Sequence, residues 1–465
     1  MSVHTFPDSL ETGLRMLAAG QWTAEELTNH CLERIHSQNP ELNAFLTVSD
    51  AYARQRAHAV DTLATSFPEG LGPLAGAPIS IKDLIHTSFA PTTYGSQIYR
   101  DYRPTANASV VQRLERAHAI IVGKTHLHEF AYGITNENAH YGPARNPVDT
   151  KRMTGGSSGG SAASVRASLA LASIGTDTGG SIRIPASLTG IVGYKPTHGL
   201  VPVDGVLPLA STLDHVGPLT RTVRDAALLT DVLALTHGTG SSLLGALDEI
   251  AEGPLRIGIP SRLVERFATD PVANHFAQLV SFLEESHLVN WKSELRFDED
   301  EIALHQGNIQ GAEAFSVHRT WLQEHGHLYG EDVFERLQTS SKISAQDYIY
   351  SLAFRQAFQR EIDGWFDEID VILLPTTPVF APILGTESVV VRGEASHIRP
   401  LMTRFTNPWN LSGMPAISIP GGIVDGLPFG LQLVGRFGKD ARLLQIAARV
   451  EQALTDWNET TGGRR

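Results

Sequence analysis

Two glycine–serine clusters lie close together in this chain, and their hydroxyls could support nucleophilic chemistry. "GGSSGGS" contains Ser157 and Ser158, and "GTDTGGS" ends at Ser181. A serine hydroxyl is a poor nucleophile at neutral pH and needs a base beside it. Lys82, which follows the apolar segment "PISI", could be such a base if it were uncharged, and burial lowers the pKa of a lysine.

Four interpretations compete for the two clusters. A flexible linker is disfavoured because apolar, patterned sequence lies on both sides, and a phosphate-binding loop because neither cluster matches G-x-x-x-x-G-K-[ST]. The stretch from Gly156 to Gly160 matches a G-x-S-x-G nucleophile elbow with Ser158 as the nucleophile, but polar, turn-like residues precede it where a strand is needed. The fourth interpretation takes both clusters together with Lys82.

On this fourth interpretation the chain resembles the amidase signature family. The resemblance is carried by "APISIKDLI", "GGSSGGSAASV" and "GTDTGGSIRIPASLTGIVGYKPTHG", in the order of the family. It extends to "HEFAYGITNENAHYGPARNP", "STLDHVGPLTRTVRDAALL" and "NLSGMPAISIPGG", and it covers most of the chain outside residues 235–345. The resemblance implies an enzyme that hydrolyses amides without a metal or an organic cofactor.

The resemblance also implies a role for individual residues. Lys82 matches the family's catalytic lysine, Ser157 the serine that relays a proton, and Ser181 the nucleophile. The residues that match the backbone amides of the oxyanion hole are Thr178, Gly179, Gly180 and Ser181. A hydroxyl both donates and accepts, so Ser157 can take a proton from Ser181 and pass one to Lys82. Returning that proton would protonate the leaving nitrogen. In the family the peptide bond entering the relay serine is cis.

Four residues near the clusters are candidates for binding or bracing. Tyr132 and Gly133 lie in a segment that borders the substrate pocket in the family, so they are candidate pocket residues, with an ordinary turn as the alternative for Tyr132. Asp177 and Arg183 flank the nucleophile. We expect them to brace the loop through hydrogen bonds rather than to bind substrate.

Other polar patterns are predicted to be structural. Asp83 is expected to brace its loop, since a carboxylate close to Lys82 would keep the lysine protonated. His126 and His128 lack the H-E-x-x-H spacing, so they do not predict a metal site. Residues 392–410 mix arginine with aromatic residues and precede "NLSGMP", so they could touch substrate, but we expect them to form a solvated loop.

Short apolar strands that alternate with helices predict an α/β fold. Thr23 and Glu26 have the spacing of a capping box, with Pro40 closing that helix, and Asp270 with Pro271 predicts a second helix start. Strands are expected at Ile79–Ile81, Ala119–Val122, Leu255–Ile259, Val371–Leu374, Ala416–Ile419 and Gly430–Val434. We therefore expect a mixed, largely parallel central sheet flanked by helices on both faces.

Residues 1–465 are predicted to form a single amidase-signature domain. Residues 235–350 are richer in helix-forming and charged residues and predict a variable, mainly helical insertion within that domain. Residues 460–465 are predicted to form a flexible tail.

Composition and charge restrict the classes of partner. The 465 residues are 42% hydrophobic and 19% charged, which is ordinary for a globular protein. The formal net charge of −13 gives no sequence-wide attraction for nucleic acid or an anionic membrane. The single cysteine, Cys31, suits a reducing cytoplasm, and no apolar run reaches the roughly 20 residues of a membrane helix. We expect a soluble cytoplasmic protein with a small-molecule amide-type substrate and no membrane. If it is a stand-alone amidase, we expect no nucleic-acid partner; a homo-oligomer is left open.

The predicted activity is hydrolysis of a carboxylic amide through a Ser–Ser–Lys triad and an acyl-enzyme, with carbamates, urea-type bonds and esters as open alternatives. The second hypothesis is the glutaminase component of a tRNA-dependent amidotransferase complex. The family motifs fit both, but the loop "VVVRGEASHIRPLMTRF" resembles stand-alone amidases and biuret-type hydrolases. A binding protein that kept the fold is disfavoured because Lys82, Ser157 and Ser181 are all present.

Overall fold

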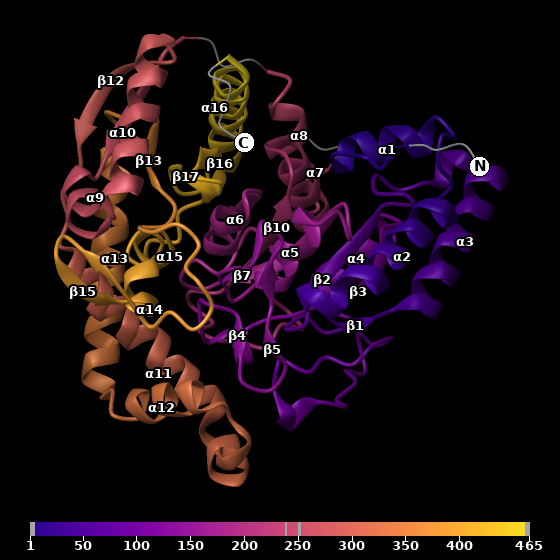
Figure 1. The fold of residues 1–465 in the computed structure, drawn as a ribbon, viewed down its shortest axis with the longest axis horizontal. Coiled ribbons are helices and arrows are strands. Elements are labelled where there is room, and N and C mark those ends of the chain that lie inside the picture. Colours follow the sequence, from indigo (N-terminus) through magenta and orange to yellow (C-terminus); the bar gives the residue numbers. More distant parts are fainter. Residues whose placement is uncertain (1–4, 238–239, 250–252, 461–465) are drawn as a thin grey trace.

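The computed structural model describes residues 5–237, 240–249 and 253–460 (Figure 1). Within these residues eleven strands form one continuous sheet. From one edge to the other they are β1 (Phe45–Val48), β3 (Ile120–Thr125), β2 (Pro78–Lys82), β8 (Ala172–Asp177), β10 (His215–Thr220), β9 (Val192–Lys195), β16 (Ala416–Val424), β17 (Leu427–Val434), β13 (Val371–Pro375), β11 (Leu255–Ile259) and β12 (Val289–Glu294). The remaining strands form two-stranded hairpins: β4 (Glu137–Asn138) with β5 (Gly142–Pro143), β6 (Arg145–Asn146) with β7 (Asp149–Met153), and β14 (Ser388–Val391) with β15 (Glu394–His397).

Helices surround the sheet, and Figure 1 shows α1–α4 at one end of the molecule and α9–α13 at the other. In chain order the α-helices are α1 (Leu10–Ala18), α2 (Ala24–Leu42), α3 (Asp50–Ser66), α4 (Ser109–Arg116), α5 (Gly159–Arg166), α6 (Arg183–Thr189), α7 (Val223–Ala234), α8 (Leu243–Ala246), α9 (Ser261–Phe267), α10 (Asp270–Glu285), α11 (Glu299–His325), α12 (Glu331–Ser340), α13 (Ala345–Trp365), α14 (Ile398–Met402), α15 (Asn407–Leu411) and α16 (Asp440–Thr460).

Local sequence signals place several helix ends. The predicted capping box is present: Thr23 accepts from the amide of Glu26, whose side chain accepts from the amide of Thr23. The helix continues through Pro40, contrary to the prediction, and ends where Asn43 adopts a left-handed conformation. Helix α10 begins one residue earlier than predicted, with Thr269 in the N-cap position.

Both faces of the sheet are covered, because side chains of a strand alternate between its faces. In β3, Ile121 packs into a core that includes Val111 of α4 and Leu229 of α7. Its neighbours Ile120 and Val122 pack into a separate core with residues of α2 and α3. The predicted α/β fold with a mixed sheet and helices on both faces is confirmed.

The sheet is less parallel than predicted. In its described part, β2–β3, β2–β8, β11–β12 and β11–β13 are parallel, and the other six pairings are antiparallel. A short connection can only return a neighbouring strand in the antiparallel direction. Strands β16 and β17 are joined in this way at Asp425 and Gly426.

The segment 235–350 takes part in the main sheet. Strands β11 and β12 form its far edge, while α11 and α12 pack against each other, and α11 also contacts α13 and α15. The division of the chain into a domain with an insertion stays a prediction. Apart from Thr460, which closes α16, the predicted tail 460–465 lies outside the described residues. None of the described helices combines the length and the apolar character that crossing a bilayer requires.

Candidate active site

Lys82 is the last residue of β2. The C-terminal end of the neighbouring parallel strand β8 lies on the same side of the sheet. Its side chain is completely buried, and its Nζ lies 2.7 Å from both Ser157 Oγ and Thr176 Oγ1. Burial lowers the pKa of Lys82 to about 7, against the opposing fields of Asp177 and Asp214. A substantial fraction of Lys82 is therefore uncharged near neutral pH.

Asp83 points away from Lys82, as expected for a bracing residue. Its Oδ1 forms a fully buried ion pair with Lys124 Nζ at 3.0 Å, and its Oδ2 accepts from the amide and the hydroxyl of Thr93. Lys124 was not identified from the sequence, although its side chain is as buried as that of Lys82. The two neighbouring lysines thus differ in that only Lys124 has a carboxylate in direct contact.

The first glycine–serine cluster leads into α5. The Gly156–Ser157 peptide bond is cis, as the family resemblance implies. The Ser158 amide donates to the Ser181 carbonyl at 3.2 Å, which holds the two clusters side by side. The Ser158 hydroxyl donates to the Thr176 carbonyl on β8 at 3.1 Å. This contact turns Ser158 into the sheet, which disfavours the nucleophile-elbow interpretation.

Ser181 lies on the wall of a cavity of about 160 Å³. Tyr132 and Gly133, the two candidate pocket residues, line the same cavity. Among the hydrogen bonds of the described residues, none joins Ser181 Oγ to Ser157 Oγ. The structure therefore brings the side chains of Lys82 and Ser157 into contact. Ser181 is held beside the first cluster by the backbone hydrogen bond between Ser158 and Ser181.

The oxyanion-hole candidates follow β8 directly. The amide of Gly180 donates to Asp177 Oδ1 at 2.7 Å, so this amide is already occupied and the prediction for Gly180 is corrected. The amides of Thr178, Gly179 and Ser181 have no acceptor among the described residues. Thr178, Gly179 and Ser181 also line the cavity.

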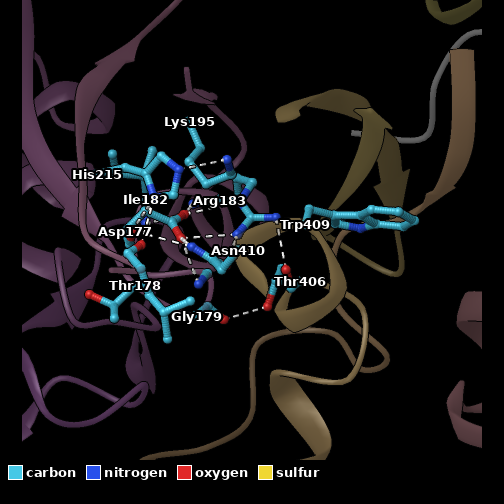
Figure 2. Close-up of polar contacts among 12 residues, drawn as sticks. Asp177, Thr178, Gly179, Ile182, Arg183, Lys195, His215, Thr406, Trp409 and Asn410 are labelled. Atoms are coloured by element: carbon cyan, nitrogen blue, oxygen red, sulfur yellow. Dashed lines mark hydrogen bonds and ion pairs between the residues drawn. The ribbon is translucent and has the colours of Figure 1, made fainter. Parts of the chain in front are cut away.

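Asp177 and Arg183 form a buried network that holds this loop (Figure 2). The Arg183 guanidinium donates to both Asp177 oxygens, at 2.9 and 3.0 Å, and both side chains are fully buried. Arg183 also donates to Asn410 on α15 and to Gln432 on β17. Burial alone would raise the pKa of Asp177, but Arg183 and Asn410 hold it well below its usual range.

One wall of the cavity contains two arginines that were not predicted as site residues. Arg336 lies on α12 and Arg399 on α14, and each forms an ion pair with the same oxygen of Asp332, at 2.6 and 2.7 Å. His128 Nε2 lies 2.9 Å from that same oxygen. The Arg336 guanidinium stacks over the Tyr132 ring, 5.1 Å from its centroid. Two cations thus share one carboxylate at the cavity wall.

The prediction of a solvated segment at 392–410 holds up to His397, which is exposed, and is wrong from Ile398 onward. This segment contains α14 and α15, and Arg399, Thr403 and Asn407 line the cavity. Trp409 is completely buried. No local pattern distinguishes such residues from a surface loop, because their burial depends on packing against segments far away in the chain.

His126 and His128, which the sequence does not predict to bind a metal, both contact other side chains. His126 Nδ1 lies 2.9 Å from Asn136 Nδ2, and burial lowers the pKa of His126 to about 3. Within residues 5–237, 240–249 and 253–460, no three His, Cys, Asp or Glu side chains are grouped so that they could hold a metal ion.

Comparison with known proteins identifies related chains. The family model described as Amidase matches residues 26–444. A relative from Chloroflexus aggregans (strain MD-66 / DSM 9485), named as a subunit of Glutamyl-tRNA(Gln) amidotransferase, is 37% identical over 95% of each chain. A crystal structure of an amidase shares 35% identity with a TM-score of 0.88, covering 96% of this chain and 99% of that one. A structure described as a vestigial protein complex that reveals the evolutionary origins of an s-triazine catabolic enzyme shares 30% identity with a TM-score of 0.89, covering 97% and 98%.

These relatives correct one prediction. Eight curated relatives, the Chloroflexus aggregans protein among them, carry this same name at 34–37% identity over 93–96% of this chain. They are named as one subunit of an enzyme whose name specifies glutamyl-tRNA, so the expectation that nucleic acid plays no part is wrong. Net charge is summed over the whole chain and says nothing about a local interface or about what other subunits bind.

Proposed function

Because this chain belongs to the amidase family and is therefore an enzyme that hydrolyses carbon–nitrogen bonds, we propose that it cleaves a carboxylic amide with Ser181 as nucleophile, Ser157 as relay and Lys82 as base. The observation that carries the proposal is the contact of 2.7 Å between Lys82 Nζ and Ser157 Oγ. Burial lowers the pKa of this lysine to about 7, so the contact joins a hydroxyl to an amine that can accept its proton.

In the proposed reaction, neutral Lys82 takes the proton of Ser157 while Ser157 takes that of Ser181. The Ser181 oxygen attacks the substrate carbonyl, and a negative charge develops on the carbonyl oxygen. When the tetrahedral intermediate collapses, the proton returns through Ser157 to the leaving nitrogen. Water then hydrolyses the acyl-enzyme by the same route.

The backbone after β8 would stabilise the developing charge. The amides of Thr178, Gly179 and Ser181 have no acceptor among the described residues and border the cavity, whereas that of Gly180 is used by Asp177. Losing one such donor in an acyl-transfer enzyme typically costs about 10²–10³ in rate. We therefore propose these three amides as the oxyanion donors, and Tyr132 and Gly133 as pocket residues.

A second candidate function is supported by the charge of the cavity. Arg336 and Arg399 share the single carboxylate of Asp332, which leaves an excess positive charge for a substrate that carries a carboxylate. Glutamine is an amide of this kind. This observation, together with the name of the relatives, favours a glutaminase that works within a complex. A cytoplasmic location, expected from the single cysteine, belongs to both candidates.

Covalent labelling tests the nucleophile. An alkyl fluorophosphonate phosphorylates activated serines, and the modified peptide is identified by mass spectrometry. We expect one adduct on Ser181 in the wild-type chain and none in Ser181→Ala. Labelling of Ser158, or undiminished labelling of the variant, would refute the proposal.

The two candidate functions are separated by a substrate panel and a purification. The purified chain is assayed with glutamine, an anilide, a carbamate and a biuret-type urea. Turnover of one of the last three by the chain alone favours a stand-alone amidase. Glutamine hydrolysis that appears only after co-purification with other proteins favours the glutaminase of a complex.

A further inference from the structure

The direction in which each oxyanion-hole N–H points is fixed by whatever binds the C=O of the same peptide unit. The six atoms of a trans peptide unit lie in one plane, and its C=O and N–H point in opposite directions. A donor that binds the carbonyl of one residue therefore also determines where the amide of the next residue points. In the proposed oxyanion hole, the relevant carbonyls belong to Asp177, Thr178 and Gly180.

The carbonyls of Asp177 and Gly180 are held by groups close to the loop. The Asp177 carbonyl lies 3.1 Å from His215 Nδ1 and accepts from Asn410 Nδ2 at 3.3 Å, so the Thr178 amide is fixed (Figure 2). The Gly180 carbonyl accepts from the Ile184 amide at 2.7 Å, so the Ser181 amide is fixed.

The third carbonyl is held from a distant helix. The Thr178 carbonyl accepts from Gln306 Nε2 at 3.0 Å, and no other donor reaches it among the residues that the structure describes. Gln306 lies on α11, in the segment that the family resemblance does not cover, and its side chain is buried. The contact determines the direction of the Gly179 amide. At Gly179 itself, no Cβ adds a further restraint.

The oxygen of the Gln306 side-chain amide indicates that this position is used for its Nε2–H donor. Gln306 Oε1 is buried and has no hydrogen-bond partner within the described residues. Leaving a buried acceptor unpaired is unfavourable, so an apolar side chain of similar size would be more stable there if packing were the only requirement. The single satisfied contact of the amide group is the one to Thr178.

We propose that Gln306 is a positioning residue that aims the Gly179 amide at the oxyanion. This inference rests on the proposed function, in which Ser181 attacks and the amides of Thr178, Gly179 and Ser181 stabilise the charge. Gln306 acts through the Thr178–Gly179 peptide unit and does not itself reach the reacting atoms.

The test uses the rate of fluorophosphonate labelling in the full chain, since the phosphoryl oxygen occupies the place of the carbonyl oxygen. Gln306→Met and Gln306→Glu both keep the approximate length of the side chain and lack the amide donor. The reversible binding constant KI and the maximal labelling rate kinact are measured separately, together with the thermal midpoint of unfolding. Asn308→Leu is the control, because Asn308 lies on the same helix and its side chain bonds to Ser351 on α13 instead.

A positioning role predicts that kinact falls about 10- to 100-fold in both Gln306 variants, less than loss of a donor outright. KI should stay within about twofold of wild type, and Asn308→Leu should label like wild type. Wild-type kinact in either folded Gln306 variant would overturn the inference, and so would an equal fall in Asn308→Leu. If Ser181→Ala is labelled as fast as wild type, the proposed function fails instead. If only Ser181→Ala loses labelling, the proposed function stands without a role for Gln306.

Discussion

Replacing Lys82 by methionine should change the stability of the protein in opposite directions at low and high pH. Lys82 is completely buried, and burial lowers its pKa from 10.5 to about 7. Below pH 7 the folded state must bury a charge that the unfolded chain exposes to water. Above pH 7 Lys82 is neutral in the folded state. As the pH rises towards 10.5, Lys82 of the unfolded chain becomes neutral as well, and the penalty disappears. A methionine side chain cannot be protonated, so the variant lacks this penalty at every pH.

The magnitude follows from the two pKa values. Each tenfold change in an acid constant is worth 1.36 kcal/mol, so burying Lys82 costs the wild type about 4 kcal/mol at pH 7 and about 1 kcal/mol at pH 10. Removing Nζ leaves the hydroxyls of Ser157 and Thr176 without that partner, at a cost of about 2 kcal/mol. Lys82→Met should therefore be about 2 kcal/mol more stable than wild type at pH 7 and about 1 kcal/mol less stable at pH 10.

Urea unfolding of both proteins at pH 7 and pH 10 measures this difference, because effects common to the two chains cancel. Lys124→Met is a matched control, since Lys124 is equally buried but is paired with Asp83 at 3.0 Å. Its removal leaves an unpaired buried carboxylate, which typically costs about 3–5 kcal/mol. We therefore expect destabilisation at both pH values in the control.

A free-energy difference between Lys82→Met and wild type that is the same at pH 7 and pH 10 would refute the reasoning. It would mean that Lys82 keeps its ordinary pKa and stays protonated at neutral pH. A protonated lysine cannot accept the proton of Ser157, so the base would have to be sought elsewhere.

Three further predictions follow from the same contacts. The labelling rate of the wild type should rise with pH through a midpoint near 7 and fall about tenfold per pH unit well below it, as Lys82 becomes protonated; a rate independent of pH between 5 and 8 would contradict this. Ser157→Ala should lower kinact about 10²–10⁴-fold with little change in KI, measured by mass spectrometry, and wild-type labelling would remove Ser157 from the relay. Arg183→Met should lower the free energy of unfolding by about 3–5 kcal/mol because Asp177 loses its buried partner, whereas Arg183→Lys, which keeps the charge, should lose less; equal losses in urea unfolding would show that the charge is not what matters.

Local order in the chain was enough to predict the strand that carries Lys82 and several other local features. The apolar segment before Lys82 predicts a strand, and β2 ends at that residue. Thr23 and Glu26 predict a helix start that the structure contains. The proximity of Asp177 and Arg183 in sequence also predicts their bracing contact. In each case neighbours along the chain decide the outcome, so the pattern could be recognised without the fold.

The tertiary structure alone decided which distant groups meet at the cavity. Arg336 and Arg399 reach it from α12 and α14, and Gln306 on α11 binds the backbone of the loop after β8. It also decided that the Gly180 amide is consumed by Asp177 rather than left for substrate. Such contacts depend on how helices and strands pack across the sheet. The free energy of that packing is spread over side chains far apart in sequence, so no short pattern records it.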